Sequence, residues 1–147
     1  NRGVLHMLKI ICADEKLKPT LATIGSAGYD LKLALDVNIP RGGTVKVGTG
    51  VRMEIPAGFM GLVVPRSSTG KKGLELANTI GVIDSDYQGE ILLNIRNVGN
   101  NTFLGYKYDC LFQLIITPIR VEKMVFVQDF DNKTDRGDGG FGSTDGR

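Results

Sequence analysis

The chain has 147 residues and a net charge of +2, with 41% hydrophobic and 23% charged residues. This length suits a single domain with its own core, and the small net charge argues against direct binding of a nucleic acid. The sequence contains no signal-peptide pattern and no apolar run near the roughly 18 residues that a bilayer requires, so we expect an intracellular protein without a membrane span. Cys12 and Cys110 lie far apart among apolar neighbours. They are typical of reduced, buried thiols.

Residues 1–6 fit poorly with the rest of the chain, whereas Met7 followed by Leu-Lys-Ile-Ile resembles a natural start. We therefore expect residues 1–6 to be a remnant added to the natural protein and the domain to begin at residue 7. His6, the only histidine, would then be absent from the natural chain. Catalysis without an imidazole excludes a Ser-His triad and most zinc sites.

Short apolar or alternating runs recur along the chain, with Pro, Gly and Asn in the segments between them. One helical turn or two is expected within residues 67–76, kept short by Gly70 and Gly73. Such a series of short segments favours an all-β sandwich, jelly roll or barrel. In chain order the pattern predicts strands at residues 8–12, 29–35, 44–47, 51–55, 61–64, 80–83, 90–98, 111–117 and 121–126.

Residues 81–95 predict a β-hairpin, because an apolar strand, a polar turn at 84–89 and a second apolar strand follow one another. Backbone groups left unpaired near the turn match the edge of a pyrimidine, and Tyr87 is suited to pack against a sugar. Asp84 comes directly after an apolar strand, where it could accept a proton from an attacking water. Alternatively, Asp84 and Asp86 are turn residues that bond to their own backbone.

Residues 65–70 follow another apolar strand with the sequence Pro-Arg-Ser-Ser-Thr-Gly. Arg66, Ser67 and Ser68 suit phosphate oxygens, although a serine here could equally cap a short helix. Gln113 lies in an otherwise apolar strand. Its amide either orients a water or a loop, or is a satisfied core amide. Asp30 alone indicates only turn chemistry.

Residues 133–147 form the one low-complexity segment, rich in glycine and poor in apolar side chains. Alone it should be mobile. Arg136, Ser143 and Thr144 offer groups for a phosphate, and Phe141 offers a flat face for a base. The segment is typical either of a flap that closes over a nucleoside phosphate or of a flexible end without a role.

Taken together, five segments in fixed order closely resemble the motifs of the trimeric deoxyuridine triphosphate nucleotidohydrolases, the dUTPases. The resemblance spans about residues 8–147 and implies a jelly-roll-like β-clip barrel over residues 7–132, with residues 133–147 as a flexible flap. The matching segments are residues 27–31, 65–68, 81–91, 109–115 and 136–144.

The resemblance implies a homotrimer whose active sites are shared between subunits. It implies hydrolysis of dUTP to dUMP and pyrophosphate by water attack at the α-phosphorus, which limits uracil in DNA and supplies dUMP for dTMP synthesis. Mg²⁺ would be held through the substrate phosphates with no direct protein ligand, and Asp30 would support that end of the site, at most through water. The location would be the cytoplasm, or the nucleus for a eukaryotic or viral protein.

By motif, the resemblance assigns Asp84 as the base and Gln113 as a group that helps to place the water. Tyr87 would lie under the deoxyribose and exclude ribonucleotides. Uracil would be read by Asn78 and the backbone of Gly81, Val82 and Ile83, and the phosphates by Arg66, Ser67 and Ser68. A second subunit would add Phe141 over the base and close on the phosphates with Arg136, Gly142, Ser143 and Thr144.

Two alternatives keep the same fold. A dCTP deaminase relative would need a glutamate beside the pyrimidine 4-position, which the third motif lacks; ammonia from dCTP would identify it. A regulatory trimeric binding protein would need no catalysis, and the intact motif residues argue against that reading. They leave room for an additional regulatory protein partner.

Overall fold

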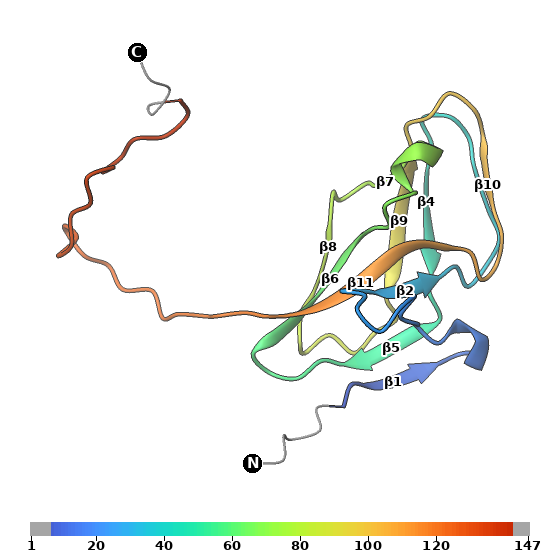
Figure 1. Ribbon diagram of the computed structural model, residues 1–147, viewed down its shortest axis with the longest axis horizontal. Helices are drawn as coiled ribbons and strands as arrows, with labels where there is room; N and C mark the ends of the chain where they lie inside the picture. The colour runs from blue at the N-terminus through green and yellow to red at the C-terminus, as the bar shows by residue number, and fades with distance from the viewer. Residues whose placement is uncertain (1–6, 143–147) are drawn as a thin grey trace.

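The computed structural model describes residues 7–142, and nearly all of its regular structure is β-strand (Figure 1). Two short 3₁₀ helices, η1 (Glu15–Leu17) and η2 (Gly70–Lys72), are the helical elements of these residues. The expected all-β class is therefore confirmed. The strands are β1 (Lys9–Cys12), β2 (Tyr29–Lys32), β3 (Val37–Ile39), β4 (Thr44–Gly48), β5 (Val51–Glu54), β6 (Phe59–Pro65), β7 (Leu74–Leu76), β8 (Gly81–Ile83), β9 (Leu92–Asn97), β10 (Phe103–Gly105) and β11 (Cys110–Pro118).

The strands form small antiparallel sheets that wrap around one core, as in a jelly roll. The largest has the order β2-β11-β6-β8, and a second has the order β4-β9-β7. Two further pairs, β1-β5 and β10-β3, extend the wall of the barrel. Since neighbours in the sheets are distant in sequence, residues from the first and last thirds of the described chain meet on β2 and β11.

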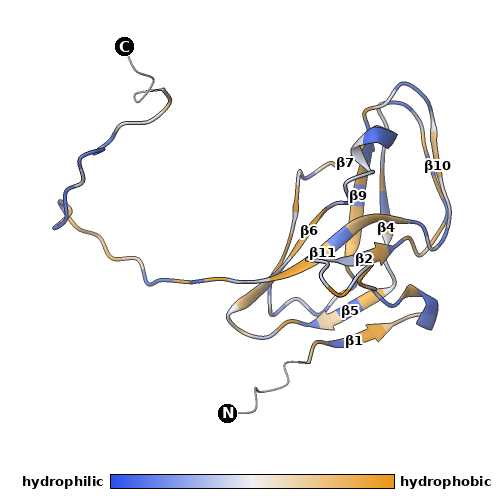
Figure 2. Cartoon of the chain, in the orientation of Figure 1, coloured by the Kyte–Doolittle hydropathy of each residue, from blue (hydrophilic) through white to orange (hydrophobic). Residues whose placement is uncertain are grey.

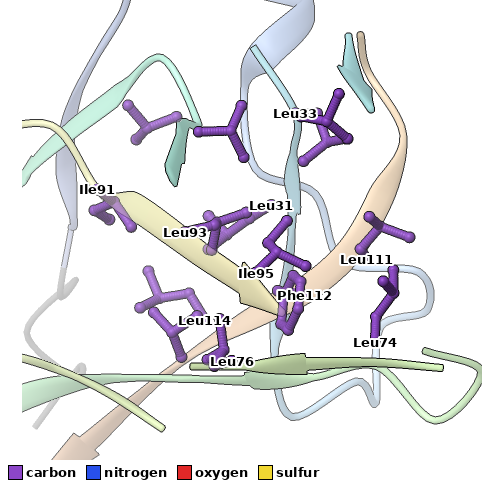
Figure 3. Close-up of a cluster of buried hydrophobic side chains, with 14 of the residues drawn as sticks. Leu31, Leu33, Leu74, Leu76, Ile91, Leu93, Ile95, Leu111, Phe112 and Leu114 are labelled. Carbon is purple, nitrogen blue, oxygen red and sulfur yellow. The ribbon is translucent and has the colours of Figure 1, made fainter. Parts of the chain in front are cut away.

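Alternating side chains of β2, β9 and β11 point inward and build the core (Figure 3). Leu31, Leu93 and Leu114 have no exposed surface. On β11 the alternation is broken, because Leu111 and Phe112 are adjacent and both buried. The register of β11 against β2 shifts between Cys110 and Phe112, so a β-bulge allows both side chains to face inward. Gln113 then falls on the outer face.

Two expectations about secondary structure were wrong. The expected strand at 121–126 is absent, and Val121, Met124 and Phe126 are almost fully exposed, because no strand of the described chain pairs with this segment. The short helical segment expected within residues 67–76 is present as η2, before β7 begins. Residues 81–95 are not a hairpin: β8 pairs with β6, whereas β9 pairs with β4 and β7. The polar turn at 84–89 instead carries the chain from one sheet to another.

Beyond Pro118 the described chain leaves the barrel as an extended segment (Figure 1). This segment contains an apolar stretch, visible in orange in Figure 2, in which Val125 and Val127 are 71% and 62% exposed. Within residues 7–142, no helix has the length and apolar character needed to cross a membrane.

Candidate active site

An ion pair on the outer face of the largest sheet joins the first two motifs. The guanidinium of Arg66, just after β6, lies 3.0 Å from the carboxylate of Asp30 on β2. Arg66 also donates from Nη1 to the Cys110 carbonyl at 3.0 Å, so β11 helps to fix its position. The Asp30 side chain is only 14% exposed. Partial burial strengthens such a charged contact and fixes the direction in which Arg66 points.

Gln113 lies beside this ion pair. It pairs directly with Asp30 across β11 and β2, and its Nε2 donates to the Pro65 carbonyl at 3.1 Å. Gly28 makes room for it, since a Cβ at that position would approach the Gln113 Oε1 to 2.5 Å. The amide is therefore satisfied by the fold and faces outward, which combines the two readings that the sequence left open.

The loop after β6 presents Ser67 and Ser68 to solvent and buries the next residue. Thr69 has no exposed surface, and its hydroxyl donates to the Leu111 carbonyl while its N–H donates to the Arg66 carbonyl. Thr69 thus ties the serine loop to β11. Sequence reasoning missed this residue; the available signal was a threonine directly before the glycine that begins η2.

A second group of motif residues surrounds a pocket of about 220 Å³, on the chain segment from β8 to β9. Asp84 is exposed at its rim, and the Tyr87 N–H donates to the Asp84 carbonyl at 3.1 Å. The Tyr87 ring is 41% exposed. The side chains that line the pocket are those of Val82, Ile83, Asp84, Tyr87, Glu90 and Leu92.

The free backbone edge of strand β8 borders this pocket. Among the described strands β8 pairs only with β6, so its other edge keeps unpaired N–H and C=O groups. Gly81 is required at its start, because a Cβ there would come within 2.8 Å of the Val63 Cβ. Asn78 is exposed just before β8, and its amide donates to the Ile80 carbonyl at 2.8 Å, which shapes the entering turn.

The two groups lie toward opposite ends of β6. Ile83, next to Asp84, is opposite Gly61, whereas Gln113 is opposite Val64. Three residues along a strand correspond to about 10 Å. Asp84 and Gln113 of one chain are therefore offset along β6 by more than a direct side-chain contact spans.

The tail residues are farther from both groups. Phe141 is fully exposed, and within residues 7–142 Arg136 donates inside its own turn, from Nε to the Gly139 carbonyl at 2.8 Å. Gly142 is exposed and has a φ of 84°. Ser143 and Thr144, the remaining residues of the expected phosphate contact, lie outside the described residues.

Two further features define the chemistry available at the Arg66 end. Burial raises the pKa of the Cys110 thiol, and the nearby Asp30 carboxylate raises it further. Cys110 therefore remains a neutral thiol at neutral pH. Within residues 7–142, no three His, Cys, Asp or Glu side chains gather as they would to hold a metal ion. At this end of the site, the described side chains supply hydrogen-bond donors and the Arg66 guanidinium. They do not form a preformed binding site for a divalent ion.

Comparison with known proteins gives one consistent result. The dUTPase family model matches residues 14–145. The deoxyuridine 5'-triphosphate nucleotidohydrolase of Paraburkholderia phytofirmans is 43% identical over 130 residues, covering 86% of this chain and 87% of the relative. The enzyme of the same name from Escherichia phage T5 is 39% identical over 145 residues, covering 94% of this chain and 98% of the relative.

Solved structures agree with the fold. The dUTPase of Streptococcus mutans superposes with a TM-score of 0.74 at 32% identity, covering 81% of this chain and 100% of that one. The dUTPase of Staphylococcus bacteriophage 80alpha, solved with dUPNHPP, has a TM-score of 0.87 at 24% identity, covering 94% and 98%. At that identity the second likeness concerns the fold alone.

Proposed function

The chain belongs to the dUTPase family and hydrolyses dUTP to dUMP and pyrophosphate; we propose that Asp84 activates the attacking water. The observation that carries this proposal is the exposed Asp84 carboxylate at the rim of the pocket that Tyr87 lines. In the proposed step the water oxygen bonds to the α-phosphorus while its proton passes to Asp84. The bond from that phosphorus to the bridging oxygen breaks, and pyrophosphate leaves with the electron pair.

The pocket suits a deoxyuridine. Unpaired backbone groups of Gly81, Val82 and Ile83 match the alternating donors and acceptors of a uracil edge, and Asn78 stands where this edge begins. The Tyr87 ring would lie under the sugar, where it denies space to a 2′-hydroxyl. Denied space is needed, because an apolar surface otherwise discriminates poorly against an added hydroxyl.

At the other end, Arg66, Ser67 and Ser68 are proposed to bind the phosphate oxygens. The Asp30 carboxylate orients Arg66 through the 3.0 Å ion pair, so that the cation is in place before substrate arrives. Mg²⁺ would enter with the triphosphate, to which it brings charge neutralisation, and Asp30 would approach it only through water. The lack of three clustered acidic or sulfur ligands in residues 7–142 fits a metal held mainly by the substrate.

We propose that each site is completed by other copies of the chain in a homotrimer. Asp84 as base and Gln113 as a guide for the water must both lie within hydrogen-bond reach of one oxygen. Their offset of about 10 Å along β6 makes this geometry unfavourable within one copy. Pairing Asp84 of one copy with Gln113 of another removes the conflict, and the family resemblance gives three as the number of copies.

The tail completes the proposed site. Phe141 and Arg136 find no partner on the barrel of their own copy, which leaves them available for a neighbouring copy. Phe141 would cover the uracil, while Arg136, Gly142, Ser143 and Thr144 would close on the phosphates. Closure would exclude water other than the attacking one. The reaction would limit uracil in DNA and supply dUMP in the cytoplasm, where nucleotide substrates are found.

The test is a panel of assays with and without Mg²⁺ that measure release of pyrophosphate from dUTP, dTTP, dCTP and UTP and release of phosphate from dUDP. We expect rapid release from dUTP with Mg²⁺ and release slower by orders of magnitude from the others. Ammonia from dCTP would point to the deaminase instead. A monomeric chain that leaves dUTP intact would contradict the proposal outright.

A further inference from the structure

The Tyr87 ring depends on a neighbouring carbonyl for its position. Its hydroxyl donates to the Glu90 carbonyl at 2.7 Å, while its own N–H bonds back to Asp84. The ring lies over Gly89, where an added Cβ would come within 2.6 Å of the hydroxyl oxygen. The position of the Tyr87 hydroxyl is therefore linked by a hydrogen bond to the backbone of Glu90.

Glu90 is in turn held by the turn between β4 and β5. Its Oε1 accepts a hydrogen bond from the Gly50 N–H at 2.8 Å in a partly buried position. Gly48 leaves the space for this carboxylate, because a Cβ there would collide with it. Gly50 has a φ of 68°, a conformation that favours glycine and points its N–H toward Glu90.

A second contact comes from the adjacent strand. Arg52 on β5 donates from Nε to the Gln88 carbonyl at 2.7 Å. Gly50 and Arg52 therefore hold residues 88 and 90 from the same side, and Tyr87 lies immediately before this pair. Glu90 also lines the pocket where the sugar would bind, whereas Gly50 and Arg52 are not among its lining residues.

We propose that Glu90 and Arg52 are positioning residues that set the rejection of ribonucleotides by holding Tyr87 in place, an inference that rests on the proposed role of Tyr87. An aromatic ring rejects an extra hydroxyl only when it cannot move aside. Displacement by about 1 Å is enough to spoil a steric or catalytic geometry. Loosening the support from β4 and β5 therefore lets UTP enter, while dUTP, which needs less room, is less affected.

The test compares kcat/KM for dUTP with kcat/KM for UTP in matched variants. Glu90→Leu removes the acceptor for the Gly50 N–H, and we expect the dUTP/UTP ratio to fall about tenfold, the effect of roughly one buried hydrogen bond. Glu90→Gln keeps an acceptor oxygen and should restore the ratio to within about threefold of the unmodified chain. Arg52 lies on the surface, and Arg52→Met keeps the aliphatic stem while it removes the donor to Gln88. We expect it to lower the dUTP/UTP ratio about threefold.

Controls separate positioning from general destabilisation. Arg96→Met and Glu75→Leu break an exposed ion pair of 3.4 Å on β9 and β7, away from the 84–90 turn, and should leave the ratio unchanged. Melting temperatures identify variants that do not fold. Should Glu90→Leu be among them, Arg52→Met and its effect on the ratio decide the question.

Three outcomes overturn the inference. Folded Glu90→Leu and Arg52→Met proteins with the original dUTP/UTP ratio would do so, as would equal losses of kcat/KM for both nucleotides, since these indicate a merely structural role. Tyr87→Ala separates the two proposals. If it keeps the selectivity, the proposed role of Tyr87 fails and the inference fails with it. If it loses selectivity while Glu90→Leu does not, only the inference fails.

Discussion

The Arg66 end of the barrel and the segment after Pro118 both contain an arginine from a family motif, yet the two arginines are held in opposite ways. Arg66 contacts Asp30 and the Cys110 carbonyl, groups from two different strands. Among the residues that the structure describes, the Arg136 side chain bonds to the carbonyl of Gly139, three residues away. The barrel holds Arg66 in place within one copy, whereas Arg136 has no hydrogen-bond partner on the described barrel of its own copy.

This difference has a physical origin in the sheet. Strands β2, β11 and β6 lie side by side, so Asp30, Gln113 and Arg66 are brought together by backbone hydrogen bonds over long sequence distances. Packing of the core beneath them offsets the conformational entropy lost when these side chains are ordered. The tail is rich in glycine and poor in apolar side chains, so under the proposed function a bound substrate and a neighbouring copy would supply the energy that orders it.

The largest effect is expected from Asp84→Asn, which keeps the shape of the side chain and removes its ability to accept a proton. Turnover of dUTP should fall about 10²–10⁴-fold, while calorimetry should show nearly unchanged binding of a non-hydrolysable analogue. Asp86→Asn, in the same turn and also exposed, is the matched control. Normal turnover in Asp84→Asn would remove this residue from its proposed role.

Removing residues 136–147 tests the contribution of the tail. Because these residues would donate to the phosphates only when the site closes, we expect about a hundredfold loss of turnover. The melting temperature and the size in solution should remain those of the full chain, since Arg136 and Phe141 do not pack on the barrel. Deleting residues 1–6 serves as the control. Full activity without the tail would show that it has no part in catalysis.

A smaller effect is expected from Gly28→Ala, which places a methyl group against the Gln113 amide. The amide must leave the Pro65 carbonyl, so we expect roughly a tenfold loss of turnover and about 1–3 kcal/mol lower stability. Gly25 lies in the same loop, and a Cβ there meets nothing within 4 Å. Gly25→Ala should therefore be silent in the same assay and in urea unfolding. Equal behaviour of the two variants would contradict the account of Gln113.

The smallest effect concerns alkaline stability. Because burial raises the pKa of the Cys110 thiol in the folded barrel, the unfolded chain loses that proton first as pH rises. The stabilisation is complete below the pKa of the thiol in the unfolded chain and declines as pH rises from there through the higher pKa in the folded chain. Urea unfolding at a series of pH values should therefore show a shallower alkaline decline for Cys110→Ala. An identical decline in both proteins would exclude this contribution.

Local pattern predicted much of the barrel correctly. Alternating apolar residues located β1, β2, β4, β5, β6, β8, β9 and β11, because one face of each strand packs on the core. The strands β3, β7 and β10 were missed, and each has only three residues. Residues 121–126 show alternation without a strand, which demonstrates that the pattern reports a side chain's need for burial and not the presence of a partner.

The motif residues and their order were readable from the chain alone, as was the all-β class, because residue chemistry and short-range periodicity are local properties. Only the tertiary structure decided which of them meet. It joined Asp30, Arg66 and Gln113 across three strands, separated them from Asp84 by the register of β6, and placed Glu90 against Gly50. Strand pairing and register depend on contacts between distant segments, and no local pattern contains them.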